Sequence, residues 1–300
     1  MYIQPLSQIF QQHSIDHQLF ADDSQLLNSS SPNDIDLSIS AVQDCVSDIR
    51  DWMTENKLQL NADKTEAMLF NSTKLENPPA SLSICQTTVS FSNSVRNLGF
   101  YLDSNLSMKD HINFVCRTCF LELRRISTIR HYLTPEATKT LVVSSVLSRL
   151  DYCNSLLAGL PQVLLNKLQR VQNCAARLVV RTPVNAHIKP VLRQLHWLPI
   201  KDRITYKIAC LCFNAINSST PAYLSDLLQL YTPSRSLRSS SDTRLLRLPL
   251  YNCKTRGDCA FSYFGPLVWS SLPFPLRNSE SLSTFKSNLK TYLFANNASD

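Results

Sequence analysis

Two adjacent carboxylates near the start of the chain are the residues best suited to chemistry. Asp22 and Asp23 follow Phe20 and Ala21 in a short F-A-D-D sequence. Strand-like residues flank the acidic pair at 18–21 and 25–27, so the pattern predicts a β-hairpin with residues 22–24 at its tip. Neighbouring carboxylates repel one another unless a cation lies between them.

Magnesium is the natural cation for such a turn. Carboxylate oxygens are hard ligands, and Mg²⁺ takes one or two of them while water and substrate phosphates complete its shell. In phosphoryl transfer the protein contributes charge and placement rather than covalent chemistry. An acidic turn is also ordinary turn chemistry, so the four residues alone leave both interpretations open.

The segments after the acidic pair predict an α+β region. Apolar residues spaced four and three apart, from Ile35 to Met53, predict a helix that begins after Ser31 and Pro32. A turn is expected over residues 56–61, and strands over 64–70 and 95–102. The second of these strands carries Gly99.

From Ser107 onward the pattern becomes helical. Two apolar stripes at helical spacing predict two long helices: Ile112, Val115, Cys119, Leu123 and Ile126 form one, and Leu164, Leu168, Val171, Ala175 and Leu178 form the other. Thr134-Pro135 and Leu160-Pro161 mark helix starts. Further helices are expected over residues 199–216 and through Phe285 and Leu289.

Composition favours an intracellular protein that does not span a membrane. The 300 residues are 44% hydrophobic, and 30 Lys and Arg against 23 Asp and Glu give a net charge of +7. This excess would suit a polyanionic partner. Arg149 and Asp151 interrupt the longest apolar stretch, residues 140–160, and no secretory signal opens the chain. We therefore expect a cytoplasmic or nuclear location.

The ten cysteines are expected to be free thiols in a reducing compartment. Cys116 and Cys119 form a C-x-x-C sequence, but no second pair follows at zinc-site spacing. Both fall on a predicted helix stripe, which favours buried thiols over a metal site.

The order of the segments is more specific than any one of them. After the F-A-D-D turn and the helix come N-K-L-x-L-N-x-x-K-T-E from Asn56 and V-R-N-L-G-F-Y-L-D from Val95. Together these motifs closely resemble the palm of reverse transcriptases from non-LTR (LINE-type) retrotransposons, in particular the jockey-like and chicken-repeat-like branch. S-R-L-D-Y-C-N-S-L-L-A-G-L-P from Ser148 resembles the helical thumb of that family, and L-H-W-L-P-I from Leu195 resembles the C-terminal region of the element.

The resemblance implies a fold and a set of roles. It implies an α+β chain with part of a reverse-transcriptase palm over residues 1–105, a mainly α-helical thumb over 106–181 and the C-terminal region over 182–300. Asp22 and Asp23 would be the catalytic ligands of Mg²⁺, and Lys64 would bind the phosphates of the incoming dNTP. Gly99 would lie in the primer-gripping strands. The implied partner is a duplex of RNA template and DNA primer.

A basic, Ser-rich segment over residues 231–256 is the other candidate for nucleic-acid binding. Its arginines include Arg235, Arg238, Arg244 and Arg247. They could contact phosphates of a duplex, although such a run is more often a solvated loop.

The catalytic set is expected to be incomplete. A working palm needs a further metal-binding aspartate from an earlier strand and fingers that hold the template. Asp16 is the one acid before Asp22, and it belongs to the strand that leads into the turn. We expect an RNA-directed DNA polymerase fragment that is inactive alone. The alternatives are a non-catalytic nucleic-acid-binding remnant and a product without selected function.

Overall fold

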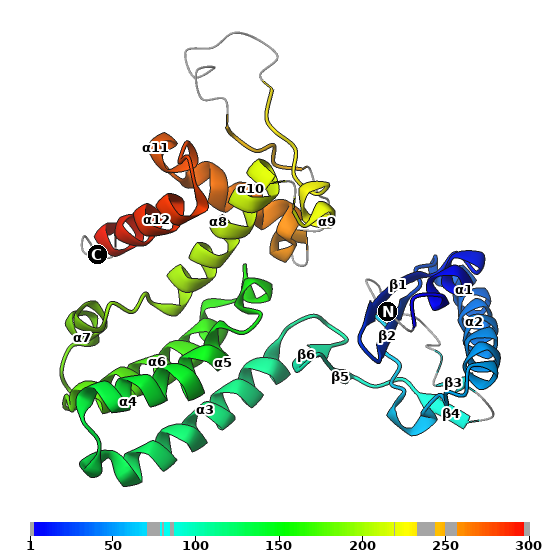
Figure 1. The fold of residues 1–300 in the computed structure, drawn as a ribbon, viewed down its shortest axis with the longest axis horizontal. Coiled ribbons are helices and arrows are strands. Elements are labelled where there is room, and N and C mark those ends of the chain that lie inside the picture. Colours follow the sequence, from blue (N-terminus) through cyan, green and yellow to red (C-terminus); the bar gives the residue numbers. More distant parts are fainter. Residues whose placement is uncertain are drawn as a thin grey trace. The chain divides into compact units, whose positions relative to one another are not determined.

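The computed structural model describes residues 3–70, 79, 81–84, 87–218, 220–232, 244–249 and 257–296 (Figure 1). The chain divides into two compact units, Met1–Ser107 and Met108–Asp300. The protein is mainly helical, with small antiparallel two-stranded sheets in the N-terminal unit. The predicted α+β class is therefore confirmed at this level.

In the described residues of the N-terminal unit, the strands form three β-hairpins. The first pairs β1 (Asp16–Phe20) with β2 (Asp23–Leu27). The second pairs β3 (Ser81–Ile84) with β4 (Thr87–Ser90), and the third pairs β5 (Ser94–Asn97) with β6 (Phe100–Asp103). Each hairpin is a separate antiparallel sheet.

Helices α1 (Leu6–Gln12) and α2 (Ile35–Glu55) provide most of the core of this unit. The 3-10 turn η1 (Pro32–Asp34) precedes α2, as the Ser31-Pro32 start signal predicted. One buried cluster joins α1 to α2, and a second joins α2 to the hairpin β3–β4. Their buried members are Leu6, Phe10, Ile15, Cys45 and Ile49 in the first, and Val46, Leu82, Ile84 and Val89 in the second.

Two strand predictions in this unit are wrong. Of residues 64–70, the first ends the 3-10 turn η2 (Ala62–Lys64), and the others form a single β-bridge, from Ala67 to Phe91. The segment predicted as one strand over 95–102 is a hairpin instead. It turns at Leu98 and Gly99, whose φ angles are 45° and 83°. Two consecutive positive φ values are typical of the tight turn that joins two twisted strands, and Gly99 adopts its value without steric cost.

The second unit consists of helices and short helical turns. Its first elements are α3 (Lys109–Ile129), η3 (Arg130–Tyr132), α4 (Pro135–Val142), the π-helical segment η4 (Val143–Leu147), α5 (Ser148–Asp151), η5 (Asn154–Leu157) and α6 (Gln162–Val180). The remaining elements are α7 (Ile188–Leu195), α8 (Ile200–Ser218), α9 (Ala222–Ser225), η7 (Gly257–Cys259), α10 (Phe261–Ser271), α11 (Phe274–Arg277) and α12 (Leu282–Asn296).

The predicted helices of this unit are confirmed. Every member of the first predicted stripe is buried on α3, which packs against α6. The second stripe lies on α6, where Leu178 alone is half-buried. Thr134 caps α4, since its Oγ1 accepts a hydrogen bond from the Ala137 N–H at 3.2 Å.

Helices α8, α10 and α12 pack around three aromatic rings. The rings of Phe213 and Phe285 stack with centroids 4.7 Å apart, and Trp269 lies 5.7 Å from Phe285. Trp269 and Phe285 are fully buried. Across the described parts of the chain, no helix combines the length and the apolar character needed to cross a membrane.

Candidate functional site

The acidic pair lies at the end of a tight hairpin. Phe20 pairs with Asp23, so the turn consists of Ala21 and Asp22 rather than residues 22–24. Ala21 has a φ of 55°, which closes the turn. Asp23 is the first residue of β2, and Ser24 follows it in the same strand. Both carboxylates are exposed.

These two carboxylates suit Mg²⁺ in type but are few in number. Among the described residues, no other side chain forms an ion pair with Asp22 or Asp23. Their oxygens are therefore available to a hydrated cation. The same part of the structure contains no group of three or more His, Cys, Asp or Glu residues that could hold a metal. A bound Mg²⁺ would neutralise phosphate charge here, with Asp22 and Asp23 as its protein ligands.

Lys64 and Gly99 lie in the same unit as the acidic pair. Lys64 is exposed at the end of η2, and its backbone N–H donates to the Asn61 carbonyl at 3.2 Å. Gly99 forms the β5–β6 turn. Within the described ranges, no hydrogen bond or ion pair links Lys64 to either aspartate. The roles of Lys64 and Gly99 stay predictions.

Two of the four candidate arginines can be placed. Arg235 and Arg238 lie outside the described residues. Arg247 is exposed, while its backbone N–H donates to the Gln229 carbonyl at 2.8 Å. The side chain of Arg244 is engaged inside the unit, because Nη1 donates to Arg277 O at 3.2 Å and to Asn217 Oδ1 at 3.3 Å.

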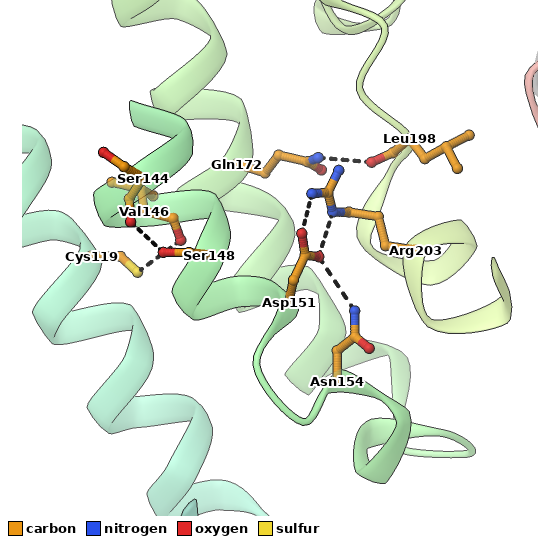
Figure 2. A network of polar contacts seen from close by, with 9 residues as sticks. All are labelled: Cys119, Ser144, Val146, Ser148, Asp151, Asn154, Gln172, Leu198 and Arg203. Carbon is orange, nitrogen blue, oxygen red and sulfur yellow. Dashed lines mark hydrogen bonds and ion pairs between the residues drawn. The ribbon is translucent and has the colours of Figure 1, made fainter. Parts of the chain in front are cut away.

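A polar network that sequence reasoning missed ties α5 and η5 to α8 (Figure 2). Arg203 donates from Nε to Asp151 Oδ1 at 2.8 Å and from Nη2 to the other carboxylate oxygen. Asn154 donates to the same carboxylate from Nδ2 at 3.3 Å. In the sequence, Asp151 is a charge that interrupts an apolar stretch and a member of the thumb-like S-R-L-D-Y-C-N-S segment. A charge at such a position was the signal that it needs a partner.

Two glutamines of α6 form a second set of bonds, to the segment before α8. The fully buried Gln172 donates from Nε2 to Leu198 O at 2.8 Å (Figure 2). Gln169 donates to Gln172 Oε1 at 2.9 Å, and its own Oε1 accepts from the Ile200 N–H at 2.9 Å. These bonds satisfy backbone groups next to the start of α8. The network therefore has a structural role.

Arg130 closes the C-terminal end of α6. It is buried, and its guanidinium donates to three carbonyls at 2.8–2.9 Å: Leu178 O, Val179 O and Leu133 O. The last carbonyls of a helix lack intrahelical partners and carry partial negative charge, so a cation is favourable there.

Charge is divided unevenly along the chain. Residues 108–300 contain 25 Lys and Arg against 10 Asp and Glu, whereas residues 1–107 contain 5 against 13. The net charges are +15 and −8. The moderate total of +7 hides a strongly basic helical unit, which suits a polyanion.

Comparisons of the chain with protein-family models, with curated proteins and with solved structures found no match.

Proposed function

We propose that the chain is the C-terminal part of a non-LTR retrotransposon reverse transcriptase and that it does not polymerise on its own. The observation that carries this proposal is the F-A-D-D hairpin, which exposes both carboxylates at a two-residue turn. Helix α2 and the Leu98-Gly99 hairpin follow it in the order of the palm that the sequence resembles. The protein would act inside the cell, in the cytoplasm or the nucleus.

In this proposal residues 1–105 correspond to the rear of the palm, 106–181 to the thumb and 182–300 to the element's C-terminal region. Asp22 and Asp23 hold Mg²⁺, and Lys64 contacts the phosphates of a dNTP. Gly99 lets the β5–β6 turn approach the primer closely, since it has no side chain. The partner is a duplex of RNA template and DNA primer.

Inactivity of the isolated chain follows from the number of ligands. With two carboxylates and without the further aspartate that the resembled palm uses, the Mg²⁺ shell would be mainly water, so the ion would be held loosely. Polymerase chemistry depends on placement and electrostatic stabilisation, and a loosely held ion provides little of either.

Metal binding tests the acidic pair separately from catalysis. Titration with Mn²⁺, followed by electron paramagnetic resonance, should show one weak site in the full chain. Asp22→Asn and Asp23→Asn should each remove it. Asp36→Asn, which changes an exposed acid in the first turn of α2, should leave it intact. Equal Mn²⁺ binding by all three variants and the parent would refute the site.

Primer extension tests the rest of the proposal. On an RNA template with a DNA primer and Mg²⁺ or Mn²⁺, the full chain should add no nucleotide. Extension that Asp22→Asn abolishes would overturn the claim of inactivity while supporting the reverse-transcriptase assignment.

A non-catalytic role in nucleic-acid binding is the second candidate, and the charge of +15 on residues 108–300 favours it. Affinity for a primer–template duplex should fall steeply between 50 and 200 mM salt, by roughly 10³-fold or more if six phosphates are contacted. The double variant Arg117→Gln/Arg124→Gln removes two exposed charges from α3 and should weaken binding. Lys57→Gln, an exposed site in the acidic unit, should not. An affinity independent of salt would contradict phosphate contacts.

A further inference from the structure

A hollow of about 570 Å³ opens in the helical unit where the C-terminal end of α6 meets η3, α4 and α7. Volumes of this order are usual for small-ligand sites in proteins. Part of its wall is apolar, including Leu133, Val179 and Leu195. The rest is polar and strongly charged.

Three cations and one carboxylate line the hollow. The cations are Arg130, Lys139 and Arg181, and the acid is Glu136. The lining therefore has a net charge of +2. In the described part of the chain, none of these three cations forms an ion pair with Glu136 or with another acid. Within the described residues, no carboxylate therefore neutralises these cations, and only the charge of Arg130 is partly offset, by three backbone carbonyls.

The two guanidiniums belong to residues held close together. Arg181 Nη2 donates to the backbone carbonyl of Arg130 at 3.2 Å. Burial lowers the pKa of Arg130, and the neighbouring charge of Arg181 lowers it further. Like charges at such a site repel, and an anion between them would relieve the repulsion.

Donors remain available for that anion. A guanidinium has five N–H groups, and Arg130 uses three of them on carbonyls. Arg181 uses one of its own five, on the Arg130 carbonyl. The three N–H groups of Lys139 have no partner among the described residues. Guanidinium groups bind phosphate oxygens in pairs, and an ammonium adds a compact charge.

We propose that this hollow binds a phosphate monoester. Such a group carries a charge of about −1.5 to −2 at pH 7, which matches the +2 of the lining better than a carboxylate of −1 does. The phosphate could belong to a nucleotide or to the 5′ end of a nucleic acid, since both present the same chemistry. The inference is independent of the proposed polymerase role, because every residue of the hollow lies in the helical unit.

Calorimetric titration of the full chain in 150 mM salt tests the site. The probes are a nucleoside monophosphate, the same nucleoside without phosphate, and one oligonucleotide with either a 5′-phosphate or a 5′-hydroxyl. The monophosphate should bind and the nucleoside should not. Lys139→Gln and Arg181→Gln should each lower the affinity at least tenfold, whereas Arg193→Gln, an exposed charge on α7 outside the hollow, should not.

The oligonucleotide pair identifies the source of the phosphate. Tighter binding of the 5′-phosphorylated strand, lost in Lys139→Gln, would show that the hollow takes a nucleic-acid end; binding of the free nucleotide alone would assign it to nucleotides. The proposal is overturned if the monophosphate shows no binding at millimolar concentration. It is also overturned if the nucleoside binds equally well, or if Arg193→Gln loses as much affinity as Lys139→Gln.

Discussion

The guanidinium of Arg203 holds both carboxylate oxygens of Asp151, which joins α8 to the end of α5. The Arg203 side chain is only 17% exposed and that of Asp151 41%. Two parallel N–H···O bonds fix the distance and the angle between the two helices more firmly than a single bond would.

Removal of one partner should therefore destabilise the helical unit. We expect Arg203→Ala to lower the free energy of unfolding by about 1–3 kcal/mol, because it leaves the Asp151 carboxylate without its charged donor and with only the Asn154 amide bonded to it. Asp151→Ala/Arg203→Ala should lose less than the sum of the single variants, since neither charge is left alone. Urea denaturation measures all three changes.

The matched control is Arg125→Ala. It breaks the Arg125–Glu122 pair, in which Arg125 is 66% exposed. Exposed pairs contribute little, so the expected loss is below about 0.5 kcal/mol. If Arg203→Ala and Arg125→Ala lowered the free energy of unfolding equally, the proposed role of Arg203 in joining α8 to α5 would be contradicted.

Arg130 gives a second prediction, about the end of α6. Arg130→Met keeps much of the side-chain bulk but removes the guanidinium that donates to three carbonyls. We therefore expect the free energy of unfolding to fall by at least about 2 kcal/mol. Arg130→Lys should recover only part of it, because one ammonium cannot reproduce the planar fork. Hydrogen exchange should show earlier opening of the last turn of α6. An unchanged exchange rate in Arg130→Met would argue against the cap.

Helix periodicity predicted most of the second unit, and the reason is physical. Each long helix there buries one face, so its apolar residues recur at helical spacing, as on α3 from Ile112 to Ile126. The hairpin β5–β6 was harder to predict from the sequence. Leu98 carries no turn signal of its own, and its positive φ follows from the pairing of Asn97 with Phe100. That pairing depends on both strands, so the residues of one strand alone do not predict it.

The candidate functional residues also differ in whether the sequence alone could identify them. The F-A-D-D turn was visible because its residues are adjacent in the sequence. Helix packing brings together Asp151 and Arg203, which are 52 residues apart, and Arg130 and Arg181, which are 51 residues apart. A single sequence can indicate that Asp151 needs a partner, but not which residue provides it.

His111 gives a prediction about pH. It is buried in the first turn of α3, and burial lowers its pKa from 6.5 to about 4. The unfolded chain therefore takes up the proton first as the pH falls. The contribution of neutral His111 is complete above pH 6.5 and is lost as the pH falls through 4, by roughly 3 kcal/mol at most.

Urea denaturation at pH 7 and at pH 4.5 checks this. The difference in unfolding free energy between the parent and His111→Gln should shrink at the lower pH. His187→Gln, at an exposed position, should show no such change. A pH-independent difference for His111→Gln would show that this histidine does not govern the acid sensitivity.

The thiols give the last prediction, on reactivity. Burial raises the pKa of Cys119 and of Cys212 to about 12, whereas Cys174 is exposed. At pH 8 only about 10⁻⁴ of a thiol with that pKa is thiolate, the form that reacts with iodoacetamide. Peptide mapping should find Cys174 alkylated at least a hundredfold faster than Cys119 and Cys212, which should react only after denaturation.

The same experiment decides between the two interpretations of the C-x-x-C sequence. Cys119 is fully buried on α3 and Cys116 is half-buried, as expected for packing residues. Binding of Zn²⁺ would deprotonate and shield both sulfurs. We expect Zn²⁺ to leave the alkylation rate of Cys116 unchanged, because burial raises the pKa of its thiol and no group of three or more metal-binding side chains exists among the described residues. Stoichiometric protection of Cys116 by Zn²⁺, reversed by a chelator, would mean that the pair binds metal after all.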